Sequence, residues 1–137
     1  MILKKFDNLY FALGRVLLGT YFLLPGLMKI AQYDATLQLM LAKEVPLTEL
    51  LLPTTIALQV GLGLLLIFAK AIRISALSLF AMTILINLYI HNFWALQEDP
   101  SYAHELQNFV KNLGIAAGLL VLAGRADLRS NSSKTKQ

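Results

Sequence analysis

The sequence predicts an all-α fold, a bundle of four membrane-spanning helices. Of its 137 residues, 57% are hydrophobic and 15% are charged, and the mean hydropathy is +0.63. Soluble domains average about 25% charged residues, and a soluble chain of this length could not bury so much apolar surface in one core. The apolar runs also lack the alternation of period two that a membrane β-barrel requires.

Four apolar runs are long enough to cross about 30 Å of hydrocarbon at a rise of about 1.5 Å per residue. The first has Arg15 as its only charged residue, the second has Glu49 near its start, and the third has none. The fourth is shorter and has Lys111 near one end. We expect helices at 9–28, 47–69, 74–94 and 109–124 in a membrane domain of residues 1–128, followed by a polar cytoplasmic tail at 129–137.

The basic residues are distributed unequally between the two ends of these helices. One end carries three lysines and most of the acidic residues, and the other carries Lys4, Lys5, Lys70, Arg73, Arg125, Arg129, Lys134 and Lys136. The positive-inside rule therefore places both termini in the cytoplasm and predicts a multi-pass protein of the cell (inner) membrane. The net charge of +4 then reflects orientation and contact with anionic lipids, and no nucleic-acid partner is expected.

The residue types limit the chemistry of this chain. It has no cysteine, which excludes disulfide, dithiol and thiolate-metal chemistry. The sequence shows no Gly-rich phosphate loop, zinc-ligand spacing or Ser-His-Asp arrangement. We therefore predict no catalytic residue and no metal site, and any electron transfer would need a bound cofactor or a partner.

Two polar side chains, Arg15 and Gln59, lie well inside apolar runs. Counted from the cytoplasmic ends of their helices, their depths differ by about 6 Å, a gap that an arginine side chain can close. A buried amide needs hydrogen bonds, so we expect Arg15 to face the bundle and to bond Gln59, as a buried pair, or backbone near it. The alternative is an arginine that extends to the cytoplasmic headgroups.

A second polar group lies at the outer ends of the helices. Lys29 follows the first span, Asn87 and His91 lie one helical turn apart in the third, and Lys111 and Asn112 begin the fourth. We predict that these five side chains form a ligand-binding site in the outer half of the bundle, where His91 could exchange a proton near neutral pH. The alternative is that they only anchor the helix ends among headgroups.

Small residues at helical spacing predict close helix contacts. Gly19 and Gly26 share one stripe of the first helix with Arg15 and Lys29. Glycine allows another helix to approach closely. The glycines expected at helix-packing positions are Gly19, Gly26, Gly61, Gly63, Gly114 and Gly118.

Five segments together resemble the DoxX family. Residues 14–19 (GRVLLG) and 25–29 (PGLMK) are similar to its opening helix, and residues 59–66 (QVGLGLLL), followed by Arg73, are similar to its second. The segments similar to its third and fourth helices are 91–94 (HNFW), 108–113 (NFVKNL) and 124–128 (GRADL). Many members carry a glutamate where this chain has Gln59, so the resemblance assigns no proton or cation coupling to that side chain.

The resemblance implies a small four-helix membrane protein. Some members are subunits of thiosulfate:quinone oxidoreductases or partners of other redox enzymes, and distant relatives are similar to cargo receptors or assembly chaperones. We therefore expect a redox-associated subunit that binds a quinone or similar amphiphile in the outer half of the bundle, an accessory subunit more than a self-sufficient enzyme. Its expected partners are the lipid bilayer and a redox subunit or a second copy. The alternative is a non-enzymatic binder or chaperone for another membrane protein.

Overall fold

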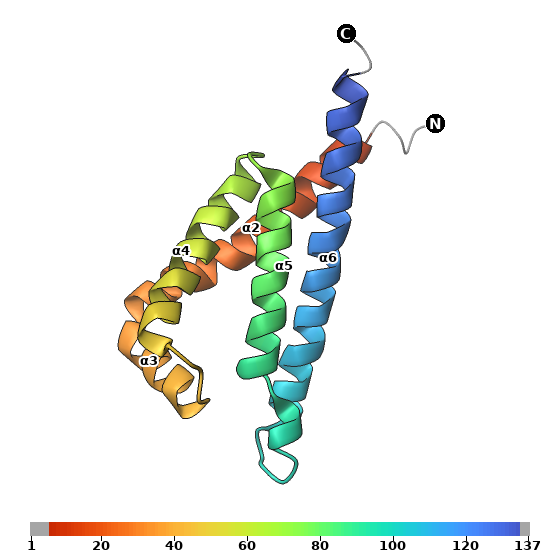
Figure 1. Cartoon of the computed structure of the whole chain (residues 1–137). Coiled ribbons are helices and arrows are strands. Elements are labelled where there is room, and N and C mark those ends of the chain that lie inside the picture. The colour runs from red at the N-terminus through yellow and green to blue at the C-terminus, as the bar shows by residue number, and fades with distance from the viewer. Residues whose placement is uncertain (1–5, 135–137) are drawn as a thin grey trace.

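The computed structural model describes residues 6–134, with side chains described as far as residue 126, and it has no strand within this range. Four helical segments are long and apolar enough to cross a membrane, as predicted. The all-α expectation is therefore confirmed. The elements are α2 (Asp7–Ala31), α3 (Tyr33–Ala42), α4 (Thr48–Ile67), α5 (Ile72–Tyr89), the short 3-10 helix η1 (Phe93–Ala95) and α6 (Tyr102–Lys134) (Figure 1).

The helix bounds differ from the expected ones in the second half of the chain. The expected third helix is divided, because α5 ends at Tyr89 and η1 is a separate turn. Helix α6 begins at Tyr102 and continues to Lys134, through most of the expected tail. Hydropathy locates the apolar middle of a helix and misses polar turns at its ends. Residues 135–137 lie outside the described part of the chain.

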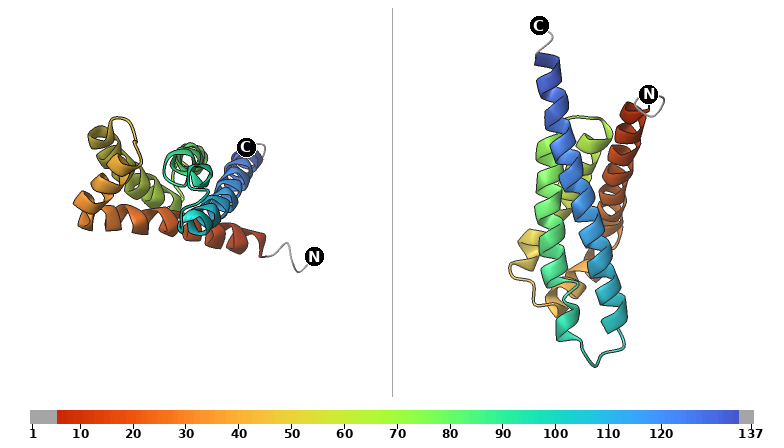
Figure 2. Two further views of the ribbon diagram at one scale, coloured as in Figure 1. Left: turned by 90° about the horizontal axis from the view of Figure 1, so that it is seen from below. Right: turned by 90° about the vertical axis from the view of Figure 1, so that its right-hand side faces the viewer.

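The helices form two antiparallel pairs, α2 with α4 and α5 with α6, and α4 also contacts α5 (Figures 1 and 2). The first and last described residues lie at one end of the molecule, which we call the inner end after the predicted orientation, while α3 and η1 lie at the opposite end, called the outer end (Figure 1). The two pairs move apart toward the outer end (Figure 1).

The pair α2 and α4 is held together by backbone contact at Gly19 and Gly63. A Cβ atom added to Gly19 would lie 2.7 Å from the Gly63 carbonyl oxygen, and one added to Gly63 would lie 2.9 Å from the Gly19 oxygen. Gly26 is equally confined, with Gln59 Cβ 3.0 Å from its added Cβ. Gly118 makes only ordinary contact, with Leu18.

Two of the glycines expected at helix-packing positions make no close contact among the described residues. Gly61 and Gly114 face open space, with nothing within 4 Å of an added Cβ. Gly61 lies two residues before Gly63, which in a helix is about 200° of rotation, so the two glycines point in opposite directions. Small-residue spacing identified close contact on one face of α4, but it did not distinguish that face from the opposite one.

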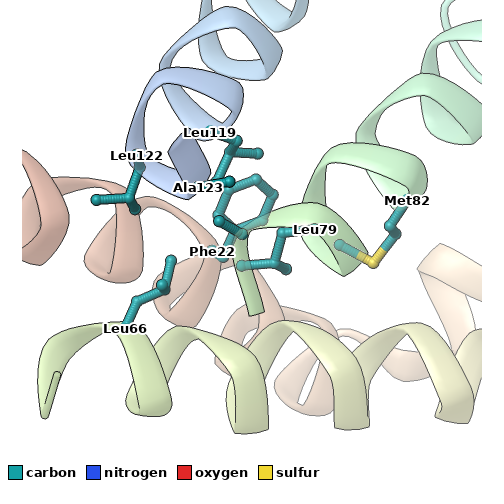
Figure 3. Packing of buried hydrophobic residues seen from close by; sticks show 8 residues of the cluster. Phe22, Leu66, Leu79, Met82, Leu119, Leu122 and Ala123 are labelled. Carbon is teal, nitrogen blue, oxygen red and sulfur yellow. The ribbon is translucent and has the colours of Figure 1, made fainter. Parts of the chain in front are cut away.

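Apolar side chains from all four long helices meet in the inner half of the bundle. Phe22 lies among Leu79, Leu119 and Ala123 (Figure 3), and Leu66 closes the cluster from α4. Outside this core, many large apolar residues are exposed, for example Leu17 (70%) and Val121 (74%). Such extensive exposed apolar surface requires lipid as solvent. The bilayer is therefore the environment of this chain.

The orientation in the membrane is a testable prediction. Four crossings place both termini on one side, and the basic residues near the inner end favour the cytoplasm. Reporter fusions after Gln137 and within residues 34–43 measure this orientation. We expect a cytoplasmic signal from the first fusion and an external signal from the second. A cytoplasmic signal from residues 34–43 would contradict the orientation.

Candidate functional site

A polar cavity of about 150 Å³ lies between the two helix pairs, on the outer side of the apolar core. Phe22 belongs to both the core and the cavity lining, so the two regions are adjacent at this side chain. All four spanning segments contribute to the wall. The lining residues are Tyr21, Phe22, Pro25 and Lys29 from α2, Gln59 from α4, Thr83 and Ile86 from α5, His91 just beyond α5, and Asn112 from α6.

One wall of the cavity is a chain of hydrogen bonds with a fixed direction. Asn87 Nδ2 donates to the Phe109 carbonyl oxygen at 3.0 Å, and Asn112 Nδ2 donates to Asn87 Oδ1 at 2.9 Å. Tyr21 completes the chain by donating to Asn112 Oδ1 at 3.0 Å. Because a backbone carbonyl can only accept, it fixes the orientation of both amides. These side chains therefore satisfy one another and join α2, α5 and α6.

His91 is held by a carboxylate. Its Nδ1 lies 2.6 Å from Glu105 Oε2, and the two side chains are 19% and 17% exposed. An ionised carboxylate only accepts hydrogen bonds, so Nδ1 carries the proton and Nε2 of a neutral ring is left as an acceptor. Among the described residues no group of three or more potential metal ligands forms.

Two polar groups in the cavity wall have no protein partner within the described part of the chain. Gln59 is 4% exposed, and its Oε1 makes no hydrogen bond. Lys29, which is half-buried, makes no hydrogen bond or salt bridge among these residues. A buried carbonyl oxygen without a donor is costly, and a cation in an apolar bundle needs an acceptor. The cavity wall therefore holds an amide without a hydrogen-bond partner and a cation.

The comparisons with known proteins agree with the fold. The DoxX family model matches residues 10–92, more than half of the chain. This chain belongs to the DoxX family. It is also 33% identical over 121 residues to the inner membrane protein YqjF of Escherichia coli (strain K12), an alignment that covers 88% of this chain and 87% of that protein. No solved structure matches it. This DoxX protein is therefore a multi-pass protein of the cell (inner) membrane, as predicted.

The structure brings together most of the side chains predicted for the outer site of this DoxX protein. Lys29, His91 and Asn112 line one cavity, and Asn87 lies directly behind Asn112. Lys111 is exposed and does not line the cavity, so the structure does not bring it together with the other four. Neighbouring helical residues point about 100° apart, and Asn112 takes the inward direction.

The expected hydrogen bond between Arg15 and Gln59 is absent. Arg15 Nη1 donates instead to the carbonyl oxygens of Leu66 and Ile67, the latter at 2.6 Å. These carbonyls belong to the last turn of α4, where backbone oxygens lack intrahelical donors and carry partial negative charge. Arg15 therefore acts at the helix end, and Gln59 is left to the cavity.

Sequence reasoning missed three polar residues of the site. Tyr21 and Thr83 looked like ordinary members of apolar helices, and Glu105 looked like a residue of an acidic outer loop. Thr83 lines the cavity and donates to the Leu79 carbonyl oxygen at 2.8 Å. The available signal was spacing, because Tyr21 lies on the same side of α2 as Pro25 and Lys29, at steps of four residues.

The outer loops meet next to His91. Lys43, which follows α3, donates to Asn92 Oδ1 at 3.4 Å. Hydrogen bonds from the Ser101 hydroxyl and backbone N–H, together with the charge of Lys43, hold the pKa of Asp99 below its usual value. The hydrogen bond from Lys43 to Asn92 links the two loops, and the Lys43 charge also stabilises the ionised form of Asp99.

Proposed function

We propose that this DoxX protein binds the ring of a membrane quinone or similar amphiphile in the outer cavity, as an accessory subunit of an oxidoreductase. The observation that carries the proposal is a pair of unsatisfied polar groups, on Lys29 and Gln59, in a cavity inside an apolar membrane bundle. A structural polar network leaves no such groups free, as the chain from Tyr21 to Phe109 illustrates.

The dimensions of the cavity support a single ring. A cavity of about 150 Å³ in another small protein holds benzene, so this one has the volume of one six-membered ring. Phe22, Pro25 and Ile86 supply apolar surface for the faces of the ring, and the polar groups surround them. A long apolar tail would leave the cavity between the helices and lie among lipids, against exposed side chains such as Leu24 and Leu113.

The proposal gives Lys29 and His91 distinct roles. Lys29 would donate to one oxygen of the ring, and His91, held by Glu105, would contact it through Nε2 and accept or return a proton. Electrons would come from a partner, because this chain has no cysteine and its described residues form no cluster of metal ligands. The protein would then hold the ring while another subunit reduces or oxidises it.

The proposal predicts which lysine matters. Decyl-1,4-benzoquinone is titrated into the purified protein in detergent micelles, and binding is measured by calorimetry. Lys29→Ala and His91→Ala should each weaken binding at least about 10-fold, since each removes a hydrogen bond made or supported by a charged group. Lys111→Ala is the matched control, because Lys111 is an exposed lysine outside the cavity, and it should leave binding unchanged.

Thermal melts of each variant separate lost binding from lost folding. Equal losses in the Lys29 and Lys111 variants would refute specific binding in the cavity. A wild-type protein that binds no quinone but copurifies with one membrane protein in constant ratio would support the alternative, an escort or assembly role.

A further inference from the structure

We infer that the cavity selects an acidic ring compound, one that carries an ionised oxygen, over a neutral ring of the same shape. This inference rests on the proposed function, because it concerns the ligand of the same cavity. It depends on a positive charge that the cavity lining leaves without a counterion and on a neutral donor beside that charge.

Lys29 is a half-buried cation without a counterion. It lines the cavity and makes no salt bridge or hydrogen bond among the described residues. None of the described residues that line the cavity is acidic. Glu105 contacts the lining residue His91, but its Oε2 is held 2.6 Å from Nδ1 of that ring, and Glu105 is not itself part of the lining. The lining therefore carries a positive charge that no lining residue balances.

The surroundings of Lys29 make this charge count. Lys111 lies at nearly the same depth but is exposed, so water or headgroup phosphates can solvate its charge. Lys29 instead shares the cavity with the apolar side chains of Phe22, Pro25 and Ile86. Charges attract one another more strongly in such surroundings than in water. Lys29 has already lost part of its hydration in the folded protein, so an incoming anion has to offset only the loss of its own hydration.

Gln59 supplies a neutral donor beside Lys29. A Cβ atom added to Gly26 would lie 3.0 Å from Gln59 Cβ, so Gln59 faces α2 one helical turn before Lys29. Its Oε1 is fully buried, whereas Nε2, which has no hydrogen-bond partner among the described residues, is the amide atom open to the cavity. An ionised oxygen can accept from the ammonium and from the amide at the same time.

The charge of the ligand decides how much the two donors contribute. A neutral carbonyl oxygen accepts the same two hydrogen bonds, but it leaves the charge of Lys29 without a counterion. A hydrogen bond between two charged groups is stronger than one from a charged donor to a neutral acceptor, and the difference corresponds to roughly 5- to 10-fold in affinity. A cationic ring of the same shape would be repelled by Lys29.

The test uses three probes of one shape that differ in charge: para-octylbenzoate, para-octylbenzamide and para-octylbenzamidine. Each is titrated into the purified protein in nonionic detergent micelles at neutral pH, and binding is measured by calorimetry. The benzoate should bind roughly 5- to 10-fold more tightly than the benzamide, and the benzamidine should bind least tightly. Unsubstituted benzoate is a fourth probe: weaker binding than the octyl form assigns the site to a membrane-embedded acid, and equal binding assigns it to a free aromatic acid.

Three variants test the residues that carry the preference, and the comparison between variants also removes differences in how the probes enter micelles. Lys29→Gln keeps a donor but loses the charge, so it should remove the preference for the benzoate by weakening mainly the benzoate. Gln59→Glu places a carboxylate beside Lys29 as a counterion and should remove the preference as well. Lys111→Gln, at an exposed lysine outside the cavity, should retain it. Thermal melts establish that each variant is folded.

The outcomes separate this inference from the proposed function. A wild-type protein that binds the benzamide as tightly as the benzoate, or an unchanged preference in folded Lys29→Gln, would overturn the inference. Binding of decyl-1,4-benzoquinone by the same preparation would then leave the proposed function intact. Absence of binding by all of these ring compounds, the quinone included, would refute both.

Discussion

Replacement of Gly19 by alanine is expected to lower the free energy of unfolding by about 2 kcal/mol or more. The new Cβ would lie 2.7 Å from the Gly63 carbonyl oxygen and 2.8 Å from Ile67 Cγ1. Overpacking typically costs about 1–3 kcal/mol, and here one neighbour is backbone, which cannot change rotamer. The higher helix propensity of alanine would return only about 1 kcal/mol. Unfolding in mixed micelles with increasing SDS, followed by circular dichroism, measures this loss.

Gly61→Ala is the matched control for that substitution. It places the same methyl group on α4, on the face where nothing lies within 4 Å. Its unfolding free energy should equal the wild-type value or exceed it by up to about 1 kcal/mol, through helix propensity. Equal behaviour of the Gly19 and Gly61 variants would contradict the close crossing of α2 and α4.

Arg15→Leu should lower the unfolding free energy by about 2 kcal/mol. The substitution removes the hydrogen bonds from the guanidinium to the Leu66 and Ile67 carbonyl oxygens. Hydrogen bonds to charged groups contribute about 1.5–3 kcal/mol, and the charge at a helix C-terminus adds some tenths. Part of this loss is offset because leucine enters the bilayer more easily. The same SDS titration measures the result.

Two further variants serve as controls for the Arg15→Leu result. Arg125→Leu removes an exposed arginine from α6 and should have little effect on stability. Arg15→Lys keeps the charge but loses the forked donor, so its stability should lie between wild type and Arg15→Leu. If Arg15→Leu were as stable as wild type, the arginine would extend to headgroups rather than join α2 to α4.

Hydropathy and residue order were sufficient to predict the four spans and the family. Each span needs a long apolar stretch, a property of composition that no tertiary contact has to supply. The ends of the helices were harder to predict, because whether a polar turn such as the one that begins α6 at Tyr102 becomes helical depends on the residues that pack around it. The division between α5 and η1 was also missed, since the run 74–94 contains neither proline nor glycine at that point.

The depth of the site residues along their helices could be predicted from the sequence. The direction in which each side chain points around the helix axis could be predicted less well. Lys29, His91 and Asn112 were placed at one level by counting 1.5 Å per residue, and the structure puts all three in one cavity. Lys111 has almost the same depth and points outward. A one-residue shift turns a side chain by about 100°, and the weak amphipathicity of membrane helices gives little information about that angle.

The roles of Arg15 and Gln59 also depended on information that depth does not contain. Depth allowed them to meet, but the carbonyl oxygens at the end of α4 are stronger acceptors for a guanidinium and lie within its reach. Which acceptor an arginine uses depends on where the neighbouring helix ends. Because Arg15 bonds these carbonyl oxygens, Gln59 has no bond to Arg15 and lines the cavity instead.

Native mass spectrometry of the wild-type protein, gently extracted from its own membrane, tests ligand binding in the outer cavity most directly. Thr83→Phe is the comparison variant, because the larger side chain on the wall should fill the cavity while Lys29 and His91 are left unsubstituted. We expect wild type to retain a small molecule with the mass of a membrane quinone or quinol, and Thr83→Phe to lose it while remaining folded. Wild-type protein that carries only phospholipid, or a Thr83→Phe variant that retains the same molecule, would contradict binding in the cavity.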